Sequence, residues 1–553
     1  MKRLRGLSEG GGWLGSQSTA IRAEIYDQIG LYKEAAELAS LETGRAQLTA
    51  LRKSILAASE SEDSRDVIRA HVWLILQCAV SQFRHENGRE DALQLLNDVI
   101  ELIELQTKDE LKSHHIRSLL YFWRGRIHTS RYAFAEAETD LTTALRVADQ
   151  TLAEKLREAD SLSDAGLRDA RRRQAVTAGD YILSACLGFG LGQLRQVEGR
   201  IADSLQFLRV AVPLSRGSGD YHRRGYAHLL MCTALRSQHD LAAADHELAD
   251  AQRLFGDPPN ENIPPHQLHL ARVHHQMALA EYNRVPPGGG KGDTEVERLN
   301  RALRLNKVAE SLSGQACYAG FQDPMLVYGI KVATSLISTA LGDYSAGRVY
   351  AEEAITCVSE RNLPKVTHSW SWLAKGMAYA EGVTKAGQVS EIGDAERALI
   401  HHVIEEETAR VTDRAAAHLH LSRLYSRIDQ PFKATVFYER AAQLVEDSEH
   451  GWTKELREIT GKLLRESLSS TFTLDIQELL DRAKKEKIPA LPYIEKLVDT
   501  QIKRRLIWLQ QDTLHDEDGA GKLARELGVT RTTIFNWKKD PTLRDVFPKN
   551  PRR

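Results

Sequence analysis

The sequence predicts an all-α protein: an α-solenoid built from helix hairpins, followed by a small C-terminal helical domain. Apolar residues recur at helical spacing along nearly the whole chain, and the alternating pattern of strands is missing. The 553 residues include only 15 prolines, mostly clustered, which favours many long helices joined by short connections. A short residue pattern also returns several times, and such self-similarity is typical of repeat architectures.

The clearest copy of the pattern is the segment YFWRGRIHTSRYAFAEAETDLTTALRVA. Its pattern positions are Tyr121, Gly125, His128, Ala137, Leu141 and Ala144. A second copy has Leu421, Tyr425, Ala434, Tyr438 and Ala441, and a half copy has Trp372, Gly376 and Tyr379. Weaker copies centre on Ala35, Ala92, Ser204, Ala244 and Ala351.

These offsets resemble the tetratricopeptide repeat (TPR), W-x2-L-G-x2-Y followed by A-x3-F. In such a pair, small residues lie where two antiparallel helices approach most closely, and glycine turns the chain between them. The resemblance implies a superhelix whose concave surface suits an extended peptide or a partner helix. We therefore expect a flexible tail at 1–20, a TPR-like repeat domain at 21–445 and connecting, dimerising helices at 446–500.

The segment DEDGAGKLARELGVTRTTIFNWKKDP, within 501–553, predicts two short helices joined by a tight turn at Gly528. Thr530 is placed to cap the second helix. Ala524 is the small residue at the predicted crossing of the two helices, and the residues spaced to form a shared core are Leu523, Leu527, Val529, Ile534 and Trp537. The residues left on the outer face of the second helix are Thr530, Arg531, Thr532, Phe535, Asn536 and Lys539.

The chemistry of this outer face favours contact with DNA. Arginine can hold guanine in a fork, and asparagine can pair with adenine. Threonine and lysine suit phosphates, and a threonine methyl or a phenylalanine can meet the thymine methyl group. From Gln501 to Arg553, twelve Lys and Arg face seven Asp and Glu, in a chain whose net charge is −2. Any DNA contact must therefore come from this local patch.

The stretch LARELGVTRTTIFNWKK, preceded by YIEKLVDTQIKRRLIWL, resembles the Fis-type helix-turn-helix. The resemblance implies a homodimer built through the preceding helices and recognition of an inverted repeat in DNA. The chain departs from that family at the entry Asp516–Ala520 and at Asn536 and Trp537. The alternative is an ordinary helical hairpin that caps the solenoid.

Patterns that would indicate catalysis are missing or weak. Gly188–Gly192 imitates a dinucleotide fingerprint without a preceding strand, and Gly288–Lys291 lacks the spacing of a phosphate-binding loop. His266, His269, His274 and His275 share one predicted helix, but no HExxH or His/Cys/Cys grouping exists. No GxSxG nucleophile elbow occurs. We expect no catalytic site, no cofactor and no metal.

Composition indicates a protein of the cytoplasm. The basic start runs into Gly10–Gly12 without an apolar stretch of signal-peptide length, and no run of about 18 apolar residues predicts a membrane span. The cysteines lie far apart in helical patterns and are expected to be reduced core residues. They are Cys78, Cys186, Cys232, Cys317 and Cys357.

The sequence thus predicts a cytoplasmic DNA-binding regulator whose solenoid binds a protein or peptide. Ligand binding would change the curvature of the solenoid, and with it the spacing of two C-terminal modules in a dimer. Two alternatives stay open. One is a protein-interaction scaffold of a bacterial stress or phage-defence complex. The other is a peptide-sensing regulator of the quorum-sensing kind, although such proteins carry the DNA-binding domain at the opposite end.

Overall fold

The structure is a computed structural model that describes residues 39–57, 62–84, 88–106, 115–217, 221–256, 266–286, 292–318, 323–361, 363, 365–383, 389–428, 430–446, 451, 453–463, 524 and 531–539. These residues contain helices and no strand, so the predicted all-α class is confirmed. The first of two compact units comprises Met1–Gly382, Val389–Ala417 and Gln443–Leu456. The second comprises Val383–Gln388, His418–Ala442 and Arg457–Arg553.

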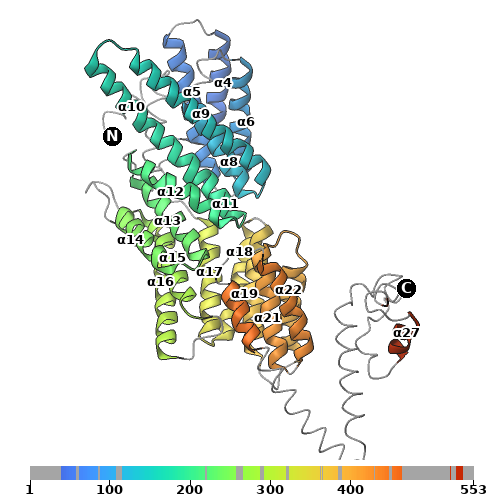
Figure 1. Ribbon diagram of the computed structural model, residues 1–553. Helices are drawn as coiled ribbons and strands as arrows, with labels where there is room; N and C mark the ends of the chain where they lie inside the picture. The colour runs from blue at the N-terminus through green and yellow to red at the C-terminus, as the bar shows by residue number, and fades with distance from the viewer. Residues whose placement is uncertain are drawn as a thin grey trace, which may run out of the picture. The chain divides into compact units, whose positions relative to one another are not determined.

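Consecutive helices in the first unit lie side by side as antiparallel pairs (Figure 1). The first helices of the successive pairs are, in chain order, α5 (Glu62–Arg84), α8 (His115–Ser130), α10 (Ala165–Ser184) with η1 (Ala185–Gly192) and α11 (Gln193–Val197), α13 (Tyr221–Ser237), α15 (Gln267–Asn283), α17 (Pro324–Ala340) and α19 (Lys365–Gly382). The second helices of these pairs, in the same order, are α6 (Arg89–Gln106), α9 (Phe134–Asp160), α12 (Ile201–Gly217), α14 (Leu241–Gly256), α16 (Asp293–Tyr318), α18 (Tyr344–Glu360) and α20 (Val389–Glu396) with η2 (Arg397–Ile404). An additional helix, α4 (Leu41–Ala57), packs on α5. The last two helices are α21 (Val411–Arg427) and α22 (Pro431–Glu446), and the hydroxyl of Ser422 in α21 donates to the carbonyl of Ala434 in α22.

Small residues allow the paired helices to approach closely, as the repeat pattern predicts. A Cβ atom at Gly125 of α8 would lie 2.8 Å from Cγ of Leu141 in α9. Gly376 has the same role in α19, where a Cβ would lie 2.5 Å from Cγ of Leu399. Other small residues of the pattern are buried too: Ala92, Ala137, Ser204, Ala244, Ala351 and Ala434. These positions therefore carry the solenoid core, and the predicted hairpin repeats are confirmed.

Four pairs share one turn between their helices. The turning residues Tyr132, Gly199, His239 and Gly342 have φ values of 59°, 83°, 68° and 85°. Each donates its N–H to the carbonyl three residues earlier, and the next residue donates to the carbonyl five positions before it. The helix thus ends at a residue in the left-handed backbone conformation, and the two hydrogen bonds satisfy carbonyls of the last turn that have no partner within the helix. Glycine was expected here, but two of the four positions carry side chains.

The segment Gly188–Gly192 lies in a helix and follows no strand, as expected. The helix is locally π-helical at Ala185–Gly192, and a Cβ at Gly190 would lie 2.7 Å from Cδ2 of Leu141. The glycines therefore permit close packing of neighbouring helices. The continuous helix Ala165–Val197 is long and apolar enough to cross a membrane, but 61% of its most apolar window is buried inside the structure. Such burial is typical of a core helix.

Four of the five cysteines, Cys78, Cys186, Cys232 and Cys357, are buried and free, as predicted. Burial raises the pKa of Cys78, Cys186 and Cys232 to about 12, so these thiols stay neutral and unreactive. The side chain of Cys317 lies outside the described residues.

Candidate ligand-binding groove

The first unit contains a groove of about 1060 Å³. Its walls come mainly from one helix of each pair: α5, α8, α10–α11, α13, α15, α17 and α19, with the start of α21. The lining residues of α13 show why, since Tyr226, Leu229, Thr233 and Arg236 are three or four positions apart and share one helix face. The groove is thus the continuous inner surface of the stacked hairpins, the kind of surface that α-solenoids use for binding.

Aromatic side chains supply much of the groove surface. Trp123 lies at the centre of one cluster, with ring centroids 5.4 Å from Phe122 and 6.1 Å from Phe83. The guanidinium of Arg126 lies 5.1 Å from the Trp123 ring centroid. A second cluster joins Phe189 and Tyr226, with centroids 4.9 Å apart. Rings of this kind give large apolar contact area at low conformational cost, which suits the side chains of a bound peptide.

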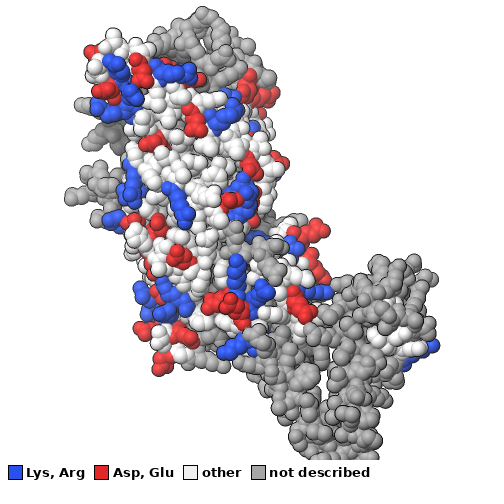
Figure 2. Space-filling model, viewed as in Figure 1, with Lys and Arg blue, Asp and Glu red and all other residues white. Residues whose placement is uncertain are grey.

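Among the described lining residues, seven arginines face three carboxylates, and no lysine is present. The arginines are Arg89, Arg126, Arg200, Arg223, Arg236, Arg272 and Arg410. The carboxylates are already engaged: Asp323 by Arg272, Asp413 by Arg410, and Glu198 by Arg195. The groove therefore carries a positive excess although the chain as a whole is slightly acidic. On the face of the first unit shown in Figure 2, acidic and basic side chains are interspersed.

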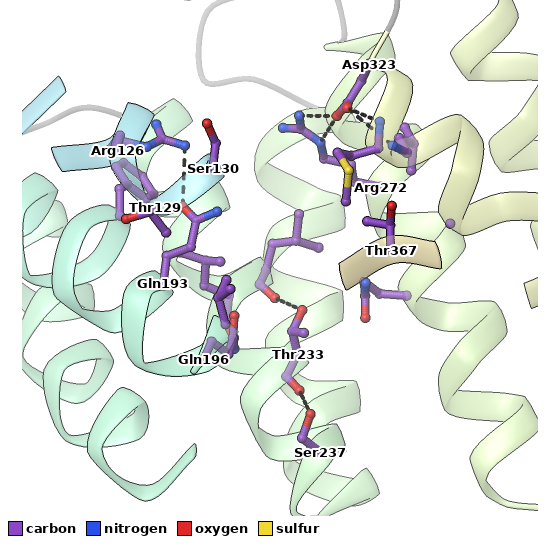
Figure 3. A pocket seen from close by; sticks show the side chains of 18 of the residues that line it. Arg126, Thr129, Ser130, Gln193, Gln196, Thr233, Ser237, Arg272, Asp323 and Thr367 are labelled. Atoms are coloured by element: carbon purple, nitrogen blue, oxygen red, sulfur yellow. Dashed lines mark hydrogen bonds and ion pairs between the residues drawn. The ribbon is translucent and has the colours of Figure 1, made fainter. Parts of the chain in front are cut away.

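Polar side chains in the groove are held by their neighbours. Figure 3 shows Arg126 of α8 pointing to Gln193 of α11, with a 3.4 Å contact between them. Gln196 donates to the carbonyl of Leu230 at 2.9 Å and so ties α11 to α13. Thr233 and Ser237 donate their hydroxyls to carbonyls of their own helix. These contacts fix the polar positions before a ligand arrives.

A polar chain crosses from α17 to α13. Asp323 accepts from Met325 and Leu326 at the start of α17, and Arg272 of α15 donates to it at 2.5 Å (Figure 3). Arg272 also lies 3.0 Å from Nδ1 of His269, whose Nε2 lies 2.7 Å from Nε2 of His222. Three groove helices are therefore coupled through one hydrogen-bonded chain.

His222, His266 and His269 together place one ligand atom each within 4.8 Å of the others. Arginine is only a donor, so Nδ1 of His269 accepts, and the neutral ring carries its proton on Nε2. Nδ1 of His266 also accepts, from the backbone N–H of His269. A metal ion needs the unprotonated nitrogen, so these contacts favour a proton shared between His269 and His222 over a cation.

The sequence missed this cluster, because His222 comes from α13, some distance from the other two in the chain. Of the four histidines that share the predicted helix, His266 and His269 belong to the cluster, whereas His275 bonds Asn306 and His274 is not part of it. Only the packing of α13 against α15 brings His222 to the N-terminus of α15.

The predicted DNA-binding residues lie in the sparsely described C-terminal region. A helix, α27, spans Arg531–Lys539. On this helix Asn536 and Lys539 are exposed and Ile534 is buried. Ala524, which precedes the helix in the chain, is buried too. Thr530 lies outside the described residues, as do the side chains of Arg531, Thr532 and Phe535. The base-contacting role of the six residues stays a prediction.

Comparisons with known proteins give structural similarity only. No family model matches the chain, and no curated protein matches it. A Rap protein crystallised in complex with competence and sporulation factor is 12% identical, with a TM-score of 0.44 over 80% of this chain and 99% of that chain. The apo form of RapI is 10% identical, with a TM-score of 0.41 over 78% of this chain and 97% of that one. The function proposed below rests on the groove itself.

Proposed function

We propose that this chain is a non-enzymatic regulator of the cytoplasm whose solenoid groove binds an extended polypeptide. The observation that carries the proposal is the groove of about 1060 Å³, lined by aromatic rings and by more arginines than carboxylates. Rings would receive apolar side chains, and the guanidinium groups would receive carboxylates. The expected ligand is a peptide, or a segment of a partner protein, that carries both.

The shape of the site supports a peptide over a compact metabolite. Its walls come from successive helices along the stack, so it is elongated along the solenoid rather than closed by one element. Polar groups such as Gln193 and Gln276 line the groove together with the aromatic rings. An extended chain offers backbone donors and acceptors at regular intervals, which such side chains can bind.

A synthetic library of random peptides with free carboxylates tests the groove. Immobilised full-length protein is expected to retain a subset, whose affinity falls about tenfold or more in Trp123→Ala, because a central aromatic contact is lost. The matched control is Trp372→Ala. Trp372 is also partly buried, but it stacks on His402 with centroids 3.8 Å apart and does not line the groove. Retained peptides that bind Trp123→Ala as tightly as the wild type would contradict the proposal.

As the output of the regulator, we propose DNA binding by a homodimer through the C-terminal helix-turn-helix. The exposed Asn536 and Lys539 and the buried Ile534 on α27 support the predicted division into a DNA face and a core face. Asn536 would then pair with adenine, and Lys539 would contact phosphate.

Fluorescence anisotropy on DNA from the protein's own upstream region, over a salt series, tests this output. Affinity should fall steeply with salt, and Arg531→Ala and Asn536→Ala should each lose about 1–3 kcal/mol of site preference. Lys538→Ala removes an exposed charge from the same helix outside the predicted set, and should weaken all sequences alike. Absence of binding would favour the scaffold alternative, in which this module only packs on protein.

A further inference from the structure

Arg236 differs from its equivalents in the repeat. In four helix pairs, the carbonyl that accepts from the positive-φ turning residue belongs to Thr129, Gln196, Arg236 or Thr339. The first three of these side chains line the groove. Three of the four positions are neutral, and α13 alone among these places a charge there. The repeat geometry therefore does not require an arginine at this position.

The contacts of Arg236 include no acid. Its Nε donates to Oε1 of Gln276 in α15 at 3.2 Å, a neutral partner. The three groove carboxylates are engaged by other arginines, as described above. Within the part of the chain that the structure describes, no carboxylate is paired with Arg236.

The other groove arginines have compensation. Arg272 and Arg410 form ion pairs with Asp323 and Asp413, and Arg200 forms one with Asp203. Arg89 lies within the field of Asp323. Arg126 and Arg223 lie over aromatic rings, Arg223 at 3.3 Å from the centroid of Tyr181. Among the groove arginines, Arg236 thus stands out because the described residues offer it neither a countercharge nor an aromatic ring.

The electrostatics of the surroundings agree. Burial lowers the pKa of Arg236, and the opposing influence comes from Cys232, whose thiol is itself neutral because burial raises its pKa to about 12. The adjacent His275 is neutral as well, since burial lowers its pKa to about 4, with a further lowering by Arg236. A partly buried cation among neutral groups is unfavourable until an anion joins it.

We propose that Arg236, with Gln276 beside it, is the receptor for a carboxylate of the bound peptide. The guanidinium fork matches the two oxygens of a carboxylate, and the amide nitrogen of Gln276 is a further donor at the same place. The carboxylate is either the C-terminus of the peptide or an Asp or Glu side chain. This inference rests on the proposed function, because it places a specific group of the ligand in the groove.

The stability of the ligand-free protein gives a first test. Arg236→Met removes the charge at similar length, so the melting temperature should stay unchanged or rise. The matched control, Arg272→Met, leaves Asp323 without its partner and should lower the melting temperature. If Arg236→Met lowers it as much as the control does, Arg236 is a structural cation and the proposal is wrong.

Peptide retention gives the second test. The random library is offered to immobilised full-length protein as free acids, as C-terminal amides and as methyl esters, which neutralise every carboxylate. The wild type should retain the free acids about tenfold or more better than the esters, and Arg236→Met should lose this preference while still retaining apolar peptides. The amide arm shows which carboxylate is bound: a loss of retention indicates the C-terminus, and full retention indicates a side chain.

The outcomes separate the two proposals. Equal retention of acids and esters by the wild type would overturn the carboxylate receptor and leave peptide binding intact. Retention of no peptide in any form would overturn the proposed function, and the carboxylate receptor with it.

Discussion

At the scale of single residues, His275 joins three helices. Its Nδ1 lies 2.9 Å from Oδ1 of Asn306 in α16, and Asn306 donates to the carbonyl of Ile330 and to the hydroxyl of Thr334 in α17. Burial lowers the pKa of His275 to about 4, so the folded protein holds this ring neutral. Protonation would leave a charge at the junction of α15, α16 and α17, where burial of the ring leaves little water to solvate it.

Stability should consequently fall as the pH is lowered. The folded pKa of His275 lies below its value of about 6.5 in the unfolded chain, so between pH 7 and 5 only the unfolded state takes up the proton. We expect the wild type to lose about 2 kcal/mol more than His275→Gln over this range. Urea denaturation at each pH measures the difference, and identical pH profiles for the two proteins would contradict it.

At the scale of elements, two glycines show the effect of backbone conformation apart from that of packing: Gly342 in a turn between paired helices, and Gly314 inside a helix. Gly342 has a φ of 85°, and a Cβ built on it would meet nothing within 4 Å. Gly314, inside α16, would likewise meet nothing. The two glycines therefore differ in their backbone conformation rather than in the space around them.

Alanine at these two positions should have opposite effects. Gly342→Ala should destabilise the protein by about 1 kcal/mol, because an L-residue is strained at positive φ. Gly314→Ala should stabilise it by roughly 0.4–1 kcal/mol, because alanine favours the helix and restricts the unfolded chain. Thermal denaturation of both variants checks the signs. If both changes destabilise the protein, backbone conformation does not determine the effect of alanine at these two positions.

At the scale of the molecule, the end of α22 and the residues that follow it reach the groove. Within the first unit, Leu444 and Thr453 line the cavity. Nε2 of His239 lies 3.4 Å from Oε2 of Glu455, and a Cβ at Gly451 would lie 2.7 Å from the carbonyl oxygen of Gln238. Described residues of Gln443–Leu456 thus contact both the cavity and the turn after α13.

Gly451→Val should displace this segment from the turn, since the added carbons have no room beside Gln238 and His239. We expect faster amide hydrogen exchange in 453–456 and at the end of α13, with the rest of the solenoid unchanged. Gly393→Val is the control, because a Cβ at Gly393 would meet nothing within 4 Å. Wild-type exchange in the Gly451 variant would show that the segment does not depend on this contact.

The sequence by itself determined the helical class and the hairpin repeats. Close approach of two helices demands a small residue at one point, as at Gly125 and Ala137, and this demand recurs along the stack, as at Ala244 and Gly376. A local, periodic requirement leaves a mark in the sequence that can be recognised without the structure. The base-contacting face of the C-terminal helix was likewise inferred from the sequence, and it stays a prediction.

Only the tertiary structure decided what the groove contains. Whether an arginine has a carboxylate beside it depends on the neighbouring helices: Arg272 meets Asp323, whereas Arg236 meets Gln276. The approach of His222 to His269 has the same origin. These partners lie tens of positions apart on successive pairs, with no fixed spacing, because the lengths of the intervening helices and loops vary. The sequence could therefore predict a concave surface, whereas the positive charge of the groove and the proposed carboxylate receptor at Arg236 depend on how the helices pack.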